Sequence, residues 1–321
     1  MNTQPGDYCE FVHELISSNA YGRFAEDRDI ESSIALRLEA LSHEGLLKRP
    51  DVVVVESKNG IGQLDGILLY HHSNWDSTHF SFPVVILDAI IIRYDDYFQR
   101  FNVAKELFSG FTAECRSNGV RLVMSKFSSR DLAVIHAGES CGSEFIESWI
   151  YNKFDLRKFK VNSEMKVALR VAREEDMPIM QSFARNSFAT QRFHADKRIP
   201  NEKAEELYQK WIQTSFSDTN QKVLVHDVDG KPAAFAIYFT SNLQSTIGLN
   251  FTNWKMALID PALQGKGLGA HFFHSLFFYH QQEGSDIVDS GLSLRNVASL
   301  NLHNKLGFKV TSTLVSMHLW L

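Results

Sequence analysis

The sequence predicts a mixed α/β (α+β) protein that consists of two tandem copies of one domain, each with a mixed sheet flanked by helices. Three observations support this fold class. Runs of β-branched residues alternate with amphipathic helical patterns along the chain. The same order of patterns occurs twice. The length of 321 residues suits about two domains, and we expect them to cover residues 1–160 and 161–321.

The first half begins with a helical segment and continues with strands and helices in alternation. Residues 51–56 read DVVVVE, a run of β-branched side chains typical of a strand. Residues 103–117 carry apolar residues at helical spacing, and Asn118-Gly119 ends this helix. The full expectation is helices over 8–47, 103–117 and 130–140, and strands over 51–56, 66–70, 84–92, 121–127 and 145–154.

The second half follows a charged segment, residues 158–166, which is the expected linker. Asp229-Gly230 lies between two apolar runs and predicts a hairpin with a two-residue turn. The full expectation is strands over 167–171, 223–228, 233–240, 252–259, 287–292 and 308–321, and helices over 174–187, 202–214, 267–282 and 296–305.

Subtracting 165 from the later residue numbers aligns the two halves without a gap. Gly307 then falls on Gly142, and Asn296 falls on Asp131 at an expected helix start. The copies differ at residues 264–269, which read QGKGLG, because the aligned residues 99–104 contain no glycine. We therefore expect a degenerate N-terminal copy, and only the C-terminal copy can bring bare backbone close to a bulky anion.

Composition excludes several classes of protein. The chain has 33 Lys and Arg against 38 Asp and Glu, a net charge of -5, so it lacks the basic excess of a nucleic-acid-binding protein. Its three cysteines are too few and too scattered for a disulfide framework. The N-terminus does not resemble an export signal, and the most apolar run, residues 82–92, is far shorter than the ~20 residues a bilayer needs.

The segment from Gln264 to Ala270 joins an expected strand to an expected helix. Glycines at 265, 267 and 269 remove side chains there, so backbone N–H groups at the positive end of the helix can bind a pyrophosphate. Lys266 adds a cation. The GxxxxGK[ST] pattern of a P-loop is absent, and a dinucleotide-binding fingerprint would open the first helix of a βαβ unit. A glycine-rich surface turn without a ligand remains the alternative.

Two strings, WKMALIDPALQGKGLGAHFF and NVASLNLHNKLGF, resemble the two signature motifs of the GCN5-related N-acetyltransferases (GNAT). The first of these motifs contains V-x-P and [QR]-x-x-G-x-[GA], and the second ends in GF. The matching residues are Ile259, Asp260, Pro261, Gln264, Gly267, Gly269, Asn296, Ser299, Leu302, Gly307 and Phe308. The order of elements over residues 167–321 is also similar to that of the family, so we expect residues 161–321 to be the catalytic domain.

The resemblance implies acetyl-CoA as co-substrate, bound in a V-shaped opening between two splayed strands. Its pantetheine would pair with the backbone of Leu258 and Ile259 like an added strand. Asn296 would lie near the co-substrate, or would only cap the next helix. The pyrophosphate would contact the backbone of Gln264, Gly265, Lys266, Gly267, Leu268, Gly269 and Ala270.

His303 lies seven residues after Asn296, where the family often has a tyrosine that protonates the departing CoA thiolate. An imidazole can supply a proton near neutral pH, so the resemblance implies that His303 is the catalytic acid. A histidine at a helix surface or core edge is the alternative. Much of the rate could also come from orienting the two reactants, with no essential side chain.

The group that accepts the proton of the amine is not identified by spacing, and His194, Asp196, His226 and water are candidates. Residues 75–80 (WDSTHF), 192–196 (RFHAD) and 207–212 (LYQKWI) resemble bacterial sugar-amine N-acetyltransferases, of the type that acetylates dTDP-fucosamine (dTDP-4-amino-4,6-dideoxygalactose). This resemblance places Arg192 and His194 on the substrate side, with Arg192 paired to a diphosphate. Packing of these aromatic residues between domains is the alternative.

The expected function is transfer of an acetyl group from acetyl-CoA to a primary amine, with a nucleotide-linked amino sugar as the favoured acceptor. Alternatives are a protein, peptide or other small-molecule amine, and a non-catalytic acyl-CoA-binding module. We expect a cytoplasmic enzyme without nucleic-acid or membrane partners, and a homodimer is compatible with the sequence. His271 and His274 share a helix face but lack a carboxylate partner, so no metal site is expected.

Overall fold

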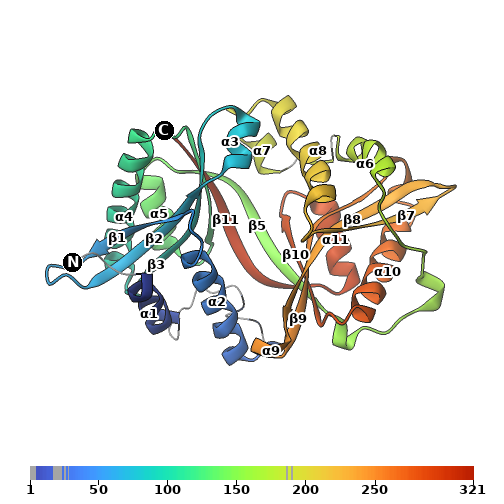
Figure 1. Cartoon of the computed structure of the whole chain (residues 1–321), viewed down its shortest axis with the longest axis horizontal. Coiled ribbons are helices and arrows are strands. Elements are labelled where there is room, and N and C mark those ends of the chain that lie inside the picture. The colour runs from blue at the N-terminus through green and yellow to red at the C-terminus, as the bar shows by residue number, and fades with distance from the viewer. Residues whose placement is uncertain (1–4, 17–23, 25–26, 28, 186, 189–190) are drawn as a thin grey trace. The chain divides into compact units, whose positions relative to one another are not determined.

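The computed structural model describes every residue except 1–4, 17–23, 25–26, 28, 186 and 189–190 (Figure 1). The chain divides into two compact units. The first unit comprises Met1–Ser148 together with Thr311–Leu321, and the second unit comprises Trp149–Val310. The last strand of the chain therefore belongs mostly to the first unit. The predicted domains, 1–160 and 161–321, follow the sequence repeat instead and remain a prediction.

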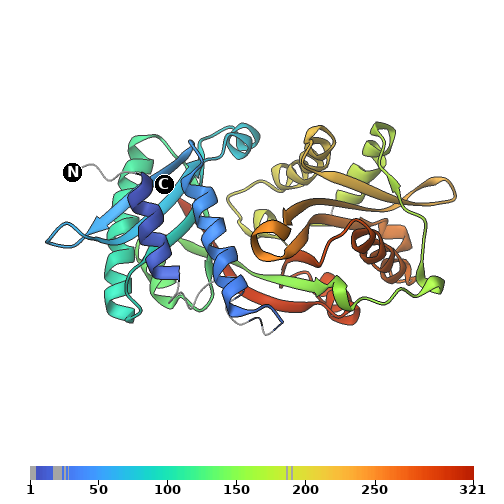
Figure 2. The ribbon, with the colours of Figure 1, turned by 60° about the horizontal axis from the view of Figure 1, so that its bottom comes forward.

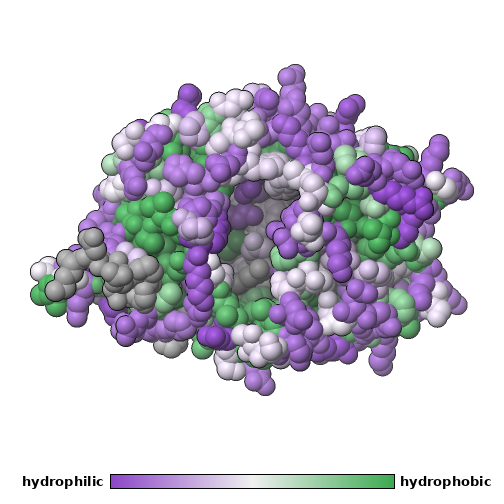
Figure 3. Space-filling model, viewed as in Figure 1, coloured by the Kyte–Doolittle hydropathy of each residue, from purple (hydrophilic) through white to green (hydrophobic). Residues whose placement is uncertain are grey.

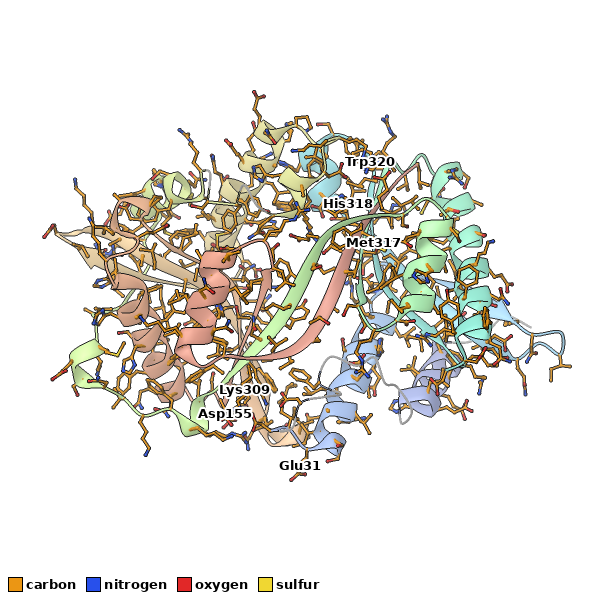
Figure 4. The ribbon with its side chains drawn as sticks, turned by 180° about the vertical axis from the view of Figure 1, so that it is seen from behind. Glu31, Asp155, Lys309, Met317, His318 and Trp320 are labelled. Carbon is orange, nitrogen blue, oxygen red and sulfur yellow. The ribbon has the colours of Figure 1, made fainter. Side chains whose placement is uncertain are left out.

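The sheet of the first unit has the strand order β1-β2-β3-β4-β11. These strands are β1 Val52–Lys58, β2 Leu64–His72, β3 Val84–Ile92, β4 Leu122–Ser128 and β11 Lys309–Trp320. Strands β3 and β4 are parallel, and the other neighbours are antiparallel. Figure 4 labels Met317, His318 and Trp320 along the part of β11 that pairs with β4.

Helices cover both faces of this first sheet. They are α1 Pro5–Ile16, α2 Ser32–Leu47, α3 Asn74–Phe80, α4 Tyr97–Ser117 and α5 Leu132–Ser140. Leu68 and Tyr70 of β2 pack with α4, whereas Ile67 and Leu69 pack with α1 and α2. This alternation is the period of two that a strand imposes on its side chains. The sequence pattern does not predict α3, which begins where the Ser73 hydroxyl accepts a hydrogen bond from Asp76 N.

The sheet of the second unit has the strand order β5-β10-β9-β8-β7-β6. Its strands are β5 Glu144–Asp155, β6 Arg170–Val171, β7 Lys222–Val228, β8 Lys231–Leu243, β9 Leu249–Ile259 and β10 Ile287–Ser293. Only β9 and β10 are parallel. The predicted hairpin at Asp229-Gly230 is confirmed, because both residues adopt the positive φ angles (50° and 74°) that such a tight turn requires.

Two helical layers enclose this second sheet (Figure 2). One layer contains α6 Met177–Ala184, α7 Arg192–Ala195 and α8 Asn201–Ser217, and the other contains α10 Leu268–Gln282 and α11 Val297–Leu306. Short helical turns lie at 156–158, 163–165, 174–176, 244–247 and 261–263. Phe235 of β8 stacks on Phe183 of α6, whereas Trp254 of β9 stacks on Phe277 of α10. The mixed α/β fold class is confirmed.

The internal repeat is confirmed at the last helix of each copy. Asp131 and Asn296 both cap a helix with their side chains, and Gly142 and Gly307 both follow it with positive φ. The gap-free alignment, however, is wrong. The bulged residue of β3 is Asp88 and that of β9 is Lys255. Their residue numbers differ by 167, whereas the gap-free alignment requires 165. The first copy therefore has two more residues between this bulge and the next strand.

Hydrophilic residues cover most of the face in Figure 3, with smaller hydrophobic patches between them. Among the described residues, none of the helices combines the length and apolar character needed to cross a bilayer. The expected cytoplasmic location remains a prediction.

Candidate active site

The central opening of the site lies between β9 and β10. Their parallel pairing ends at Trp254 and Ser290, although β9 continues to Ile259 and β10 to Ser293. A bulge at Lys255 turns β9 at this point. The expected splayed strands are therefore present in the second unit, and the edge of β9 beyond the bulge has no strand partner on the β10 side.

Backbone direction at this edge identifies the groups that face the opening. Asp260 N donates to Ala233 O of the β8 edge at 2.8 Å. Successive residues of a strand direct their N–H groups to opposite edges, so Leu258 also points its N–H toward β8, while Ala257 and Ile259 point theirs toward the opening. An added extended chain could pair there with Ile259 more directly than with Leu258.

The glycine turn leaves its backbone uncovered at the start of α10. Gly265 and Gly267 have φ of 75° and 85°, and an added Cβ at either position would meet no atom within 4 Å. Residues 268–270 form the first helical turn, whose N–H groups have few partners within the helix. Lys266 Nζ donates to Ala262 O at 3.0 Å, which holds this cation at the turn. The geometry fits a bulky anion such as a pyrophosphate.

Gly269 and Gln264 connect the turn to β9. A Cβ at Gly269 would lie 2.9 Å from Ile259 Cδ1 and 3.5 Å from Leu302 Cδ2, so a larger residue there would require the end of the Ile259 side chain to move. Gln264 Nε2 donates to Ile259 O at 3.1 Å. These two contacts fix the glycine turn against the end of the strand that lines the opening.

Asn296 caps α11. Its Oδ1 accepts a hydrogen bond from Ser299 N at 3.1 Å, which is the capping role left open by the sequence. The cap orients the first turn of α11, and His303 follows about two helical turns later, where its ring faces β10. A contact of Asn296 with the co-substrate remains a prediction.

His303 is buried on α11, with 4% of its surface exposed. Its Nδ1 lies 2.8 Å from Ser299 O, and its Nε2 lies 3.1 Å from the hydroxyl of Ser290 on β10. Phe273 and Phe308 contact the ring, with centroid distances of 5.9 and 4.5 Å. Burial lowers the pKa of His303 below its ordinary value, while the bond to Ser299 O raises it less. The ring is therefore neutral near pH 7.

The expected substrate residues Arg192 and His194 both lie on α7, in the layer of α6 and α8. The guanidinium of Arg192 lies 4.6 Å from the ring centroid of Phe193. His194 stacks on Tyr208 of α8 at 6.2 Å, and burial lowers the pKa of His194. The sheet separates these residues from α10 and α11. Their role toward a substrate remains a prediction.

Two other candidate bases have structural partners. Asp196 is 3% exposed and forms an ion pair with Arg198, with an Oδ1 to Nε distance of 3.0 Å. His226 Nδ1 donates to Ala168 O at 2.9 Å and links β7 to the segment before β6. Both side chains therefore hold local structure.

The histidines of α10 are each bound to a neighbouring group. His271 Nδ1 donates to Gly267 O at 3.2 Å, and His274 Nε2 accepts from a backbone N–H at 2.9 Å. His280 Nε2 accepts from the indole N–H of Trp254 at 3.0 Å, and burial lowers the pKa of His280 to about 3. In the described part of the chain, no group of three or more His, Cys, Asp and Glu side chains could hold a metal ion.

The first unit has no glycine turn at the corresponding place. Helix α4 begins at Tyr97, earlier than expected, so residues 99–104 are helical, and the Asp96 carboxylate already caps this helix. Arg100 bonds to the Asp131 carboxylate and donates to Ile92 O at 3.3 Å at the end of β3. The chain's own ion pair thus bridges the end of β3 and the start of α5, and a cavity of about 160 Å³ remains beside it.

Sequence reasoning missed two features of the site. Ser290 contacts His303, but no motif singles out a serine in the strand sequence IVDSGLS. The bulge at Lys255 defines where the strands separate, and it depends on pairing with β8. Both become visible only when the register of the sheet is known.

The fold and the glycine turn fit an acyl-CoA-dependent acetyltransferase. Residues 182–308 match the model of the acetyltransferase (GNAT) family. These residues therefore form a GNAT acetyltransferase domain, and the family uses acetyl-CoA as its co-substrate.

Three known proteins illustrate the similarity. The spore coat polysaccharide biosynthesis protein SpsD of Bacillus subtilis is 19% identical over 258 residues, which are 80% of this chain and 85% of that protein. The L-methionine sulfoximine/L-methionine sulfone acetyltransferase of Salmonella typhimurium is 32% identical over 90 residues, 28% of this chain and 52% of that protein. A solved tandem GNAT protein from the clavulanic acid biosynthesis pathway has a TM-score of 0.55 and 12% identity, with 99% of this chain and 97% of that chain covered.

Proposed function

We propose that this chain transfers an acetyl group from acetyl-CoA to the primary amine of a nucleotide-linked amino sugar. The main support for acetyl-CoA as the co-substrate is that the splayed strands and the open glycine turn occur in the same unit. The similarity to a spore coat polysaccharide biosynthesis protein covers 80% of the chain, and it supports a sugar-linked acceptor.

In this proposal the second unit binds acetyl-CoA at three places. Backbone N–H groups of residues 264–270 hold the pyrophosphate at the N-terminus of α10. The free edge of β9 at Leu258 and Ile259 pairs with the pantetheine. The same edge places a backbone N–H beside the thioester carbonyl, where it stabilises negative charge on the oxygen during attack by the amine. Asn296 lies near the co-substrate.

The acceptor enters from the layer of α6, α7 and α8. Arg192 pairs with the diphosphate of the nucleotide, because a guanidinium forms charge-assisted hydrogen bonds with phosphate oxygens. His194 contacts the sugar. His303 takes part in delivering the proton that the departing sulfur requires.

The acceptor is tested by measuring CoA release from acetyl-CoA with a panel of amines: dTDP-amino sugars, the same amino sugars without nucleotide, amino acids and peptides. The proposal predicts the highest kcat/KM for a dTDP-amino sugar. A higher value for a peptide would contradict the sugar assignment. Binding of acetyl-CoA without CoA release for any amine would instead indicate a non-catalytic acyl-CoA-binding module.

The role of Arg192 is tested by R192A, with K197A as the matched loss of an exposed cation on the same segment. R192A should raise KM for the dTDP-amino sugar at least tenfold and leave KM for the free amino sugar unchanged. If R192A and K197A change KM for the dTDP-amino sugar equally, Arg192 has no specific role.

Amino-acid amines are the second candidate acceptors. The similarity to the L-methionine sulfoximine/L-methionine sulfone acetyltransferase reaches 32% identity, although it covers only 28% of this chain. The same assay tests this candidate. If amino-acid amines are the acceptors, L-methionine sulfoximine should be acetylated with a higher kcat/KM than any amino sugar.

A further inference from the structure

Ser290 occupies the point where the two strands of the site separate. It is the last residue of β10 that pairs with β9, opposite Trp254, so this residue lies at the closed end of the opening. Only 7% of Ser290 is exposed. The residue therefore lies where the thioester end of an extended co-substrate between the strands would stop.

The hydrogen bonds of His303 determine which way the Ser290 proton points. Ser299 O is a carbonyl and can only accept, so His303 Nδ1 must carry the proton of that 2.8 Å bond. In the neutral ring Nε2 then has a lone pair, and the Ser290 hydroxyl donates to it across 3.1 Å. The serine oxygen keeps its own lone pairs for another donor.

We propose that Ser290 and His303 form a proton relay that takes the proton from the attacking amine and delivers it to the departing sulfur. The proposal rests on the proposed acetyl transfer. Ser290 is the catalytic residue, because it faces the reacting atoms, and His303 is a positioning residue that acts through it. This arrangement differs from direct proton donation by His303.

The relay balances in atoms and charge. The nitrogen of the neutral amine forms a bond to the carbonyl carbon, and the carbon–sulfur bond breaks with its electron pair on sulfur. The nitrogen loses one proton to Ser290 Oγ while the original serine proton moves to His303 Nε2. The reverse movement then transfers a proton from Ser290 to sulfur. An amine and a thioester become an amide and a thiol, and both side chains return to their first state.

The first unit provides an internal comparison. Ser125 lies at the same position of β4, where pairing with β3 ends at Leu87. Its hydroxyl donates to Met317 O at 3.4 Å. The residue that aligns with His303 is Gly138, where an added Cβ would lie 3.1 Å from the Phe108 ring. The serine occurs in both copies, whereas the histidine occurs only in the copy with the glycine turn.

The environment of the ring keeps it neutral, so that Nε2 has a lone pair available for the Ser290 hydroxyl. The side chains that contact it are Phe273 from α10, Ser290 from β10, Ser299 from its own helix and Phe308. Desolvation is the main cause that lowers its pKa, and no charged side chain contributes to the shift. A neutral imidazole in such a site can accept a proton transiently and return it.

The relay is tested by S290A and H303A, with S125A as the matched control in the first unit and S290T as the variant that keeps a hydroxyl. Since general acid–base catalysis contributes about 10²–10⁴-fold, S290A and H303A should each lower kcat by about that factor. The KM for acetyl-CoA should change less than threefold. The double variant should be no slower than the slower single variant, because both residues serve one relay. S125A should keep full activity, and S290T should recover part of it.

The outcomes separate the relay from the proposed function. Wild-type kcat in S290A would overturn the relay and leave acetyl transfer intact. Absence of CoA release by the wild type with every amine would overturn both. A measurement on the free protein completes the test, since ¹⁵N NMR of the imidazole ring should show Nδ1 protonated and Nε2 bare. Protonation at Nε2 in the neutral ring would also overturn the relay.

Discussion

Gly267 provides the sharpest test of the glycine turn. Its φ is 85°, and an added Cβ there would meet no atom of the protein within 4 Å. The left-handed conformation costs a non-glycine residue about 1–2 kcal/mol, so G267E should fold with a modest loss of stability. The new carboxylate would lie at the N-terminus of α10, where the two phosphates of acetyl-CoA are proposed to bind.

Repulsion between the new carboxylate and the phosphates sets how much G267E weakens acetyl-CoA binding. Two unit charges about 5 Å apart repel by about 0.8 kcal/mol even at the dielectric constant of water. Two phosphate charges therefore oppose binding by about 1.7 kcal/mol, which is more than tenfold in the dissociation constant. The effect grows where the site excludes water. G267A adds a side chain without a charge, so it should weaken acetyl-CoA binding less than G267E does.

Gly248 supplies the matched control. It has φ of 73°, open space around an added Cβ, and a position before β9 at the end remote from the glycine turn. Isothermal titration with acetyl-CoA should give unchanged affinity for G248E and at least a tenfold loss for G267E. Thermal unfolding should show similar losses of stability for both variants. Equal affinities of G267E and the wild type would refute the assignment of this turn to the pyrophosphate.

Three further predictions concern other parts of the molecule. N296A removes the cap bond to Ser299 N and should lower the free energy of unfolding by about 1 kcal/mol, measured by denaturant titration, whereas N296D should keep the cap. R100M breaks the buried pair with Asp131 and should cost about 3–5 kcal/mol, while the folded fraction should bind acetyl-CoA with unchanged affinity; weaker binding would show that the first unit takes part. The pKa of His303 is lowered, and its neutral form accepts the proton. Activity should therefore persist above pH 6.5 and decline only as pH falls through the lowered pKa, and an acidic decline that begins above pH 6.5 would contradict this assignment.

Much of the site follows from local sequence because the chemistry is contained in short segments. The glycines at 265 and 267 are needed for the left-handed turns that the structure contains. Asn296 begins a helix in the sequence pattern and caps it in the structure. Local hydrogen bonds and allowed backbone angles determine both features, so a single sequence is enough to predict them.

The first copy has contacts that local sequence does not predict. The sequence correctly predicts that residues 99–104 lack the glycines of a binding turn. It does not predict that these residues extend α4, nor that Arg100 bonds to Asp131 across the end of β3. These contacts join residues that are far apart along the chain, and only folding brings them together.

The sequence by itself determined the class of fold, the repeat and the glycine turn, because hydrophobic period, glycine positions and capping residues act over a few neighbouring residues. The tertiary structure alone decided that β9 and β10 separate after Trp254 and Ser290, and that Ser290 meets the ring of His303. Strand register has no local signal, since a shift of one residue changes every side-chain contact across a sheet while leaving the sequence pattern the same.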